Sequence, residues 1–117
     1  MAMLREIWRN FPRKPATLKY PFERLEPAER FRGKQHFDPN LCVGCGLCAR
    51  DCPAKAIEMV TTPEGKKQPV FHLYRCIFCG VCERICPRNA IKMTKFYELA
   101  AYDKGELVMK VTPKAEE

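Results

Sequence analysis

The chain is short and basic. It has 117 residues, with 21 Lys and Arg against 14 Asp and Glu, and a formal net charge of +7. This length predicts one small domain with extensions. The sequence contains no run of about 18 apolar residues, and its start lacks the apolar stretch of a secretion signal, so we expect neither a membrane-spanning helix nor a leader. Its cysteines are therefore expected to be reduced, as in a cytoplasm.

The first predicted element is a short amphipathic helix near the N-terminus. Its apolar stripe consists of four residues at i, i+3, i+4 and i+7, namely Leu4, Ile7, Trp8 and Phe11. Arg5 and Arg9 lie off the stripe, and Pro12 and Pro15 end the helix. The helix has no hydrophobic core of its own, so another surface is expected to cover the stripe.

An extended, proline-punctuated strap is predicted from Tyr20 to Gly33. The helix and the strap make up residues 1–33, which we call the N-terminal arm. A basic arm can bind nucleic acid, anionic lipid or an acidic protein surface. Its stripe either folds back on the rest of the chain or docks elsewhere. We favour docking to a neighbouring protein, with a membrane surface as the other external candidate.

Two cysteine runs with identical spacing follow the arm. The first comprises Cys42, Cys45, Cys48 and Cys52 and ends with Pro53; the second comprises Cys76, Cys79, Cys82 and Cys86 and ends with Pro87. Three cysteines at intervals of three can converge on one centre, while the fourth points away. This spacing is the bacterial ferredoxin signature, and it predicts two [4Fe–4S] clusters bound by all eight cysteines.

Other uses of cysteine fit this pattern poorly. Zinc sites take two separated pairs of ligands, whereas each group of four here is continuous. Cysteines three residues apart converge on a common centre more readily than they form disulfides. Two oxidised clusters with their thiolates would bring about −4, which reduces the net charge to about +3 and weakens the argument for nucleic-acid binding. We therefore expect no nucleic-acid partner.

In two-cluster ferredoxins the fourth cysteine of each run binds the other cluster. Carried over to this chain, the signature implies the following ligands: cluster one is bound by Cys42, Cys45, Cys48 and Cys86, and cluster two by Cys76, Cys79, Cys82 and Cys52. No catalytic residue is predicted. His36 and His72 are expected to be structural, because the eight thiolates already satisfy both clusters.

The cysteine runs belong to an internal repeat with an offset of 34 residues. Each half is predicted to contain two strands, a cysteine loop and a helical turn that carries the fourth cysteine. The predicted strands are Gln35–Asp38, Ala56–Val60, Val70–Leu73 and Ala90–Thr94, with a turn at Glu64-Gly65. We expect an α+β, pseudo-twofold, two-cluster ferredoxin-like domain over residues 34–95.

Residues 96–117 are predicted to form a C-terminal extension. Phe96–Tyr102 is expected to be a helical turn, Leu107–Val111 an edge strand and Lys114–Glu117 a frayed tail. Within the domain, the second cysteine loop has Phe78 where the first has Gly44, so we expect cluster two to be better shielded from water.

The flanks of the cysteine runs resemble a known family. Residues 15–21 (PATLKYP), 30–34 (RFRGK) and 96–103 (FYELAAYD) are similar to the two-cluster ferredoxin subunit of respiratory complex I and of related membrane-bound hydrogenases. The resemblance implies a peripheral subunit on the cytoplasmic side of the membrane, which relays single electrons between neighbouring redox subunits near the membrane arm. The short connection between Cys52 and Cys76 makes the chain more similar to the hydrogenase or sulfane sulfur reductase complexes.

Two other functions are weighed against this one. A free soluble ferredoxin with two clusters would need no basic arm and is usually acidic. A zinc-stabilised nucleic-acid-binding module would use the positive charge directly, but the cysteine spacing disfavours it.

Overall fold

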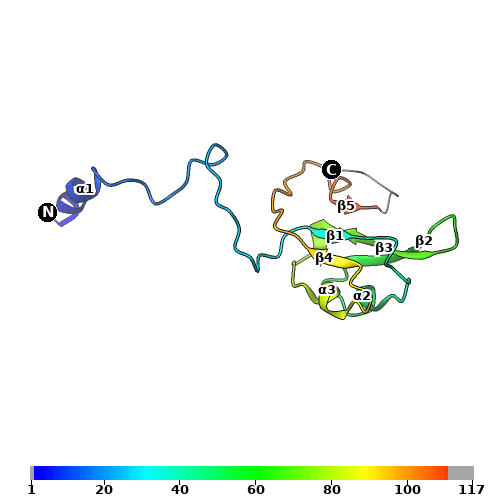
Figure 1. Ribbon diagram of the computed structural model, residues 1–117. Coiled ribbons are helices and arrows are strands. Elements are labelled where there is room, and N and C mark those ends of the chain that lie inside the picture. Colours follow the sequence, from blue (N-terminus) through cyan, green and yellow to red (C-terminus); the bar gives the residue numbers. More distant parts are fainter. Residues whose placement is uncertain (1, 111–117) are drawn as a thin grey trace.

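The computed structural model describes residues 2–110, which form a small α+β domain with an N-terminal arm. The elements are α1 (Ala2–Asn10), β1 (Gln35–Phe37), α2 (Leu47–Arg50), β2 (Ile57–Thr61), β3 (Lys67–His72), the 3-10 turn η1 (Leu73–Arg75), α3 (Val81–Ile85), β4 (Ile91–Met93) and β5 (Val108–Met109). The helices α2 and α3 pack against each other on one side of the strands (Figure 1).

Two antiparallel strand pairs form the framework of the domain. β1 pairs with β4, with Phe37 opposite Ile91, and β2 pairs with β3, with Phe71 opposite Ile57. The two pairings are equivalent under the repeat. Phe37 and Phe71 are 34 residues apart, and so are Ile57 and Ile91. β5 adds to the edge of β3.

The backbone conformations also repeat. Gly46 precedes α2 and Gly80 precedes α3, each with a positive φ, of 74° and 72°. Lys55 and Asn89 follow the two fourth cysteines in matching left-handed conformations. Each pair is separated by 34 residues, so the two halves use the same chain path to place their cysteines.

The hydrophobic core is small. Its buried members are Ile57, Phe71, Leu73, Cys82 and Ile91. A core of this size is marginal for stability without disulfides or metal. The cysteine Cys82 is itself one of the core residues, so the contents of the cysteine sites contribute to the stability of the fold.

The predicted strands are confirmed to within a few residues, but two expectations are wrong. The helical turns α2 and α3 carry the third cysteine of each run, and the fourth follows the helix end, because the helices stop at Arg50 and Ile85. Phe96–Tyr102 is not helical: the Lys34 N–H donates to the Phe96 carbonyl oxygen (2.8 Å) at its start, and the Leu99 N–H donates to the Tyr97 carbonyl oxygen (2.9 Å) within it. The expected edge strand exists as β5, and residues 111–117, including the expected frayed tail, lie outside the described residues.

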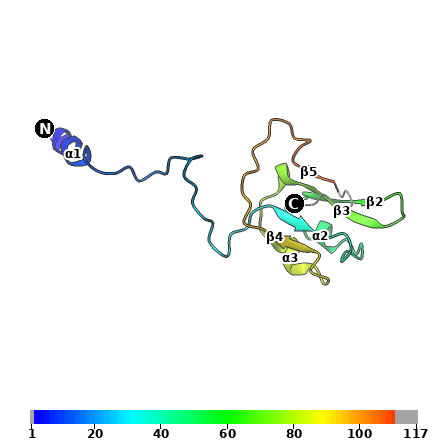
Figure 2. The same ribbon diagram turned by 45° about the horizontal axis from the view of Figure 1, so that its top comes forward.

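The N-terminal arm extends away from the domain, with α1 at its far end (Figures 1 and 2). The described part of the chain measures 72 × 27 × 26 Å along its principal axes. The apolar stripe of α1 is exposed, with Trp8 at 76% and Phe11 at 84%. The stripe is therefore not folded back onto the domain.

The second half of the arm is attached to the domain. Tyr20 donates a hydrogen bond to Glu98 (2.7 Å), and Arg24 forms an ion pair with the same carboxylate (3.2 Å). The Phe31 ring contacts the Tyr97 ring edge-on, with centroids 6.1 Å apart. The strap thus lies along the C-terminal segment for part of its length.

Candidate functional site

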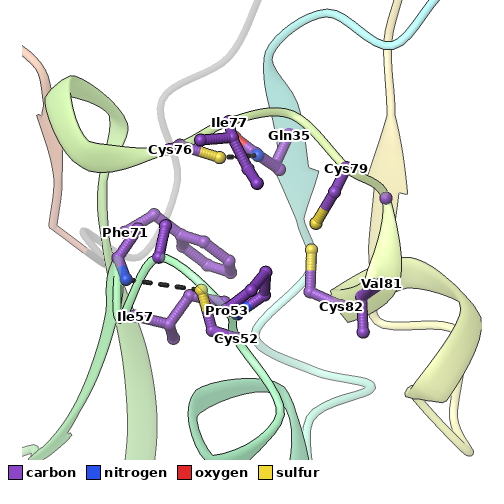
Figure 3. Close-up of a pocket in the computed structure, with 13 residues that line it drawn as sticks. Gln35, Cys52, Pro53, Ile57, Phe71, Cys76, Ile77, Cys79, Val81 and Cys82 are labelled. Carbon is purple, nitrogen blue, oxygen red and sulfur yellow. Dashed lines mark hydrogen bonds between the residues drawn. The ribbon is translucent and has the colours of Figure 1, made fainter.

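Cysteines from both runs surround one cavity of about 390 Å³, open mouth included, which we call the second site. Its cysteines are Cys52, Cys76, Cys79 and Cys82. Figure 3 shows their sulfurs around a common space, with Cys52 approaching from a different segment than the other three. Ile57 and Phe71 close the cavity on its core side.

A matching cavity of about 370 Å³, open mouth included, forms the first site. Its cysteines are Cys42, Cys45, Cys48 and Cys86. Here the core side is made by Phe37 and Ile91, the repeat partners of Phe71 and Ile57. Each cavity therefore contains three cysteines of one run and the fourth cysteine of the other.

Backbone N–H groups point at the sulfurs in the same pattern at both sites. Cys42 Sγ accepts from the Gly44 N–H and Cys76 Sγ from the Phe78 N–H, both at 3.4 Å. Cys52 Sγ accepts from the Ala56 N–H and Cys86 Sγ from the Ala90 N–H, both at 3.3 Å. Sulfur that accepts such hydrogen bonds is better suited to carry negative charge.

Burial disfavours the ionised form of the innermost thiols. Desolvation raises the pKa of Cys48 and of Cys82 to about 11 each. Iron that coordinates the sulfur offsets this cost, because metal ligation stabilises the thiolate. Four cysteine sulfurs around each cavity, together with N–H donors to two of them, fit a [4Fe–4S] cluster at each site.

Two repeat-related positions change the polarity of the cavity lining. Gln35 lines the second site where Pro69 lines the first, and Ala54 lines the second where Arg88 lines the first. The Gln35 side-chain amide donates a hydrogen bond to Cys76 Sγ at 3.0 Å (Figure 3). Sequence reasoning missed Gln35; a signal was available in the repeat, because proline at the matching position cannot make this contact.

The sites also differ in their covering. Cys45 is exposed at the first site, whereas Cys79, the cysteine at the matching position of the repeat, is half-buried at the second. Phe78 does not line the second cavity, so the expected shielding of that site by its ring is not seen. Beside the second site, the Arg32 guanidinium donates to the Cys79 carbonyl oxygen (2.9 Å).

Other candidate residues lie outside both cavities. His36 is exposed on β1, and His72 contacts Glu58 (3.3 Å) and the Tyr74 ring, at a centroid distance of 5.5 Å. Arg50 forms an ion pair with its neighbour Asp51 (2.8 Å). These contacts indicate structural roles for His72 and Arg50. In the described residues, 2–110, no helix has the length and apolar character needed to cross a bilayer.

Comparison with known proteins gives the sites a family context. Residues 41–90 match the family model for the 4Fe-4S dicluster domain. The chain is 47% identical over 104 residues to NAD(P)H-quinone oxidoreductase subunit I of Trichodesmium erythraeum, which covers 84% of this chain and 50% of that protein. It is 48% identical over 101 residues to the same subunit of Crocosphaera subtropica, which covers 81% and 52%. The chain thus spans about half the length of these relatives.

A solved structure is also similar. A chain of the membrane-bound sulfane sulfur reductase, an archaeal respiratory membrane complex, superposes with a TM-score of 0.68 at 37% sequence identity. The match covers 87% of this chain and 58% of that one. The resemblance predicted from the sequence is therefore confirmed, and the chain carries a domain for two [4Fe–4S] clusters.

Proposed function

As a homologue of subunit I of NAD(P)H-quinone oxidoreductase with a 4Fe-4S dicluster domain, this chain is, we propose, an electron-transfer subunit of a membrane-bound oxidoreductase complex. The observation that carries the proposal is the pair of matched cavities, each lined by four cysteines. Bound [4Fe–4S] clusters would supply reversible one-electron chemistry. In this proposal the subunit relays single electrons through the two clusters.

The proposed ligands follow the cavity linings. Cluster one is assigned to Cys42, Cys45, Cys48 and Cys86, and cluster two to Cys76, Cys79, Cys82 and Cys52. The crossing of the fourth cysteines joins the two halves, so neither site can form without both runs. The equal strand registers, paired N–H···S bonds and matched positive-φ residues support a pseudo-twofold domain over residues 34–95.

The chain's own residues hold and insulate the clusters. Backbone donors such as the N–H groups of Ala56 and Ala90 orient ligand sulfurs, and the core side chains Phe37 and Phe71 exclude water from the inner walls. The outer walls carry Val43 at the first site and Ile77 at the second, which are 62% and 63% exposed. These apolar side chains at the cavity rims suit close contact with other redox subunits.

The arm, residues 1–33, is proposed to dock the subunit. Its stripe of Leu4, Ile7, Trp8 and Phe11 is exposed, and a nine-residue helix is marginal in water unless a partner buries one face. We assign the partner to neighbouring subunits of the complex, close to its membrane part and on the cytoplasmic side. Residues 96–117 form the proposed C-terminal extension, which supports the strap through Glu98.

A free two-cluster ferredoxin is the alternative function. It would use the same cavities, but it gives no reason for an exposed amphipathic helix at the end of a long strap. The arm therefore favours the complex subunit.

Isolation without oxygen tests the proposal. We expect about eight iron and eight acid-labile sulfide per chain and a brown colour, because two cubanes occupy all eight cysteines. Stoichiometric zinc would contradict the cluster assignment. Affinity purification from the native membrane with mass spectrometry tests the subunit role, and recovery of the chain alone in the soluble fraction would favour the free ferredoxin.

A further inference from the structure

The side chain of Gln35 is a buried polar group with a single hydrogen-bond partner. Gln35 is 3% exposed, and its amide nitrogen lies 3.0 Å from Cys76 Sγ. Its carbonyl oxygen is buried without a hydrogen-bond partner among the described residues. Thiolate sulfur accepts but cannot donate, so this sulfur requires the amide nitrogen, rather than the oxygen, to face it.

The first site lacks this donor. The repeat partner of Gln35 is Pro69, which is fully buried in the first cavity and offers neither a side-chain donor nor a backbone N–H. The backbone donors to sulfur are otherwise the same at the two sites, with the Gly44 and Phe78 N–H groups at 3.4 Å. Gln35 therefore gives the second site one hydrogen bond more than the first.

Charged side chains near the two sites do not compensate for the additional hydrogen bond at the second site. Arg88 lines the first site, and Arg32 lies beside the second, where it donates to the Cys79 carbonyl oxygen (2.9 Å). Both arginines are exposed, and their effects are screened by solvent. Gln35 acts in a buried position, in direct contact with a ligand sulfur, where a hydrogen bond is electrostatically stronger.

We propose that Gln35 raises the reduction potential of the cluster at the second site through its hydrogen bond to Cys76 Sγ. The proposal rests on the proposed function. A donor at a ligand sulfur stabilises the state with more negative charge, which is the reduced state. Gln35 is therefore a positioning and tuning residue, which makes the two sites unequal although their frameworks match.

The test compares Gln35→Met with wild type and with Gln68→Met in an anaerobic potentiometric titration followed by visible absorbance and EPR. Methionine keeps the length of the side chain and removes the donor. Gln68 is the other glutamine of the chain, half-buried on β3 and outside both cavities. At fixed potential, Gln35→Met should lower the reduced-to-oxidised ratio of one cluster by up to about tenfold, which is about 59 mV. Gln68→Met should leave both potentials unchanged.

No shift, or equal shifts of both clusters, would overturn the proposal. A second measurement covers the case in which Gln35→Met binds less iron. Wild-type protein with glutamine labelled by nitrogen-15 at the side-chain amide should show coupling of this nitrogen to a reduced cluster in pulsed EPR, and Gln68→Met should retain it. Absence of the coupling also overturns the proposal. A wild-type chain without two clusters would instead refute the proposed function, before any variant is compared.

Discussion

The domain and the N-terminal arm solve the problem of burial in opposite ways. In the domain, aromatic and cysteine side chains such as Phe37, Phe71 and Cys82 pack around two cavities. Most residues that line one cavity have a repeat partner that lines the other. In the arm, which lies outside the repeat, Trp8 and Phe11 are exposed. The domain needs its clusters to complete its core, whereas the first part of the arm needs another surface.

The boundary between these regions is sharp. At Gly33 the chain enters the sheet, since its N–H donates to the Thr94 carbonyl oxygen (2.8 Å). Before this point the strap contacts the domain mainly through exposed polar side chains such as Tyr20 and Arg24. Changes after Gly33 should therefore affect cluster binding and folding, and changes near the N-terminus should affect assembly with partners.

The largest expected effect comes from Cys52→Ala in the domain. Cys52 lies in the second cavity with Cys76, Cys79 and Cys82, so the variant should lose the cluster of that site and keep about four iron per chain. Its resistance to denaturation should also fall, because cluster binding and folding are linked. Iron analysis and EPR of the reduced protein measure the loss of the cluster, and chemical denaturation measures the loss of stability.

Cys48→Ala is the matched variant, since Cys48 comes from the same run but lies in the first cavity. It should damage the other cluster. Identical EPR spectra for the remaining clusters of the two variants would show that ligation stays within each run, against the crossed assignment.

Gly33→Ala should have the next largest effect, at the boundary itself. A Cβ at this position would overlap the Phe96 carbonyl oxygen and lie 2.7 Å from that of Thr94. Backbone atoms cannot move away cheaply, so we expect a loss of about 3 kcal/mol or more in the free energy of unfolding. Chemical denaturation of the anaerobic holoprotein measures it.

Gly105→Ala is the control for this prediction, because a Cβ there would meet no atom within 4 Å. It should change stability by less than about 0.5 kcal/mol. Equal stability of both variants would mean that the strap packs against the sheet more loosely than these distances indicate. Gly33 would then not mark the boundary between the arm and the domain.

Trp8→Ala probes the other region. Trp8 is the large aromatic of the exposed stripe that is proposed to dock. Its truncation should therefore cost about 2 kcal/mol or more of binding free energy, which is about a thirtyfold loss of affinity for the complex. Iron content and both reduction potentials should remain as in wild type. Tyr102→Ala, at another fully exposed aromatic, is the control and should retain binding. Loss of clusters in Trp8→Ala would place the stripe in the domain's own core.

The sequence predicted the domain better than its connections, for a physical reason. Cysteine spacing, the Gly65 turn and the alternating strands are local signals, and the repeat doubled each of them. The contact of Gln35 with Cys76 spans 41 residues, and that of Tyr20 with Glu98 spans 78, so neither leaves a local pattern. The expected helical turn at Phe96–Tyr102 does not form, and its first residue instead accepts a hydrogen bond from Lys34, 62 positions away in the chain.

The smallest expected effect concerns Glu98, which connects the two regions. Glu98→Ala removes the hydrogen bond from Tyr20 and the ion pair with Arg24, both exposed to solvent, so the loss in stability should be below about 1 kcal/mol. The hydrogen bond to Glu98 raises the pKa of Tyr20, so in wild type the neutral hydroxyl is retained above its ordinary range, and the contact is lost as the pH rises through the raised value. In Glu98→Ala the Tyr20 pKa should fall back. NMR titration of carbon-labelled tyrosine measures this shift, with Tyr102 as the exposed reference in the same spectrum. An unchanged Tyr20 titration would mean that Glu98 does not hold the strap at Tyr20 in solution, and that the strap is attached to the rest of the chain only nearer Gly33, through Phe31 and Arg32.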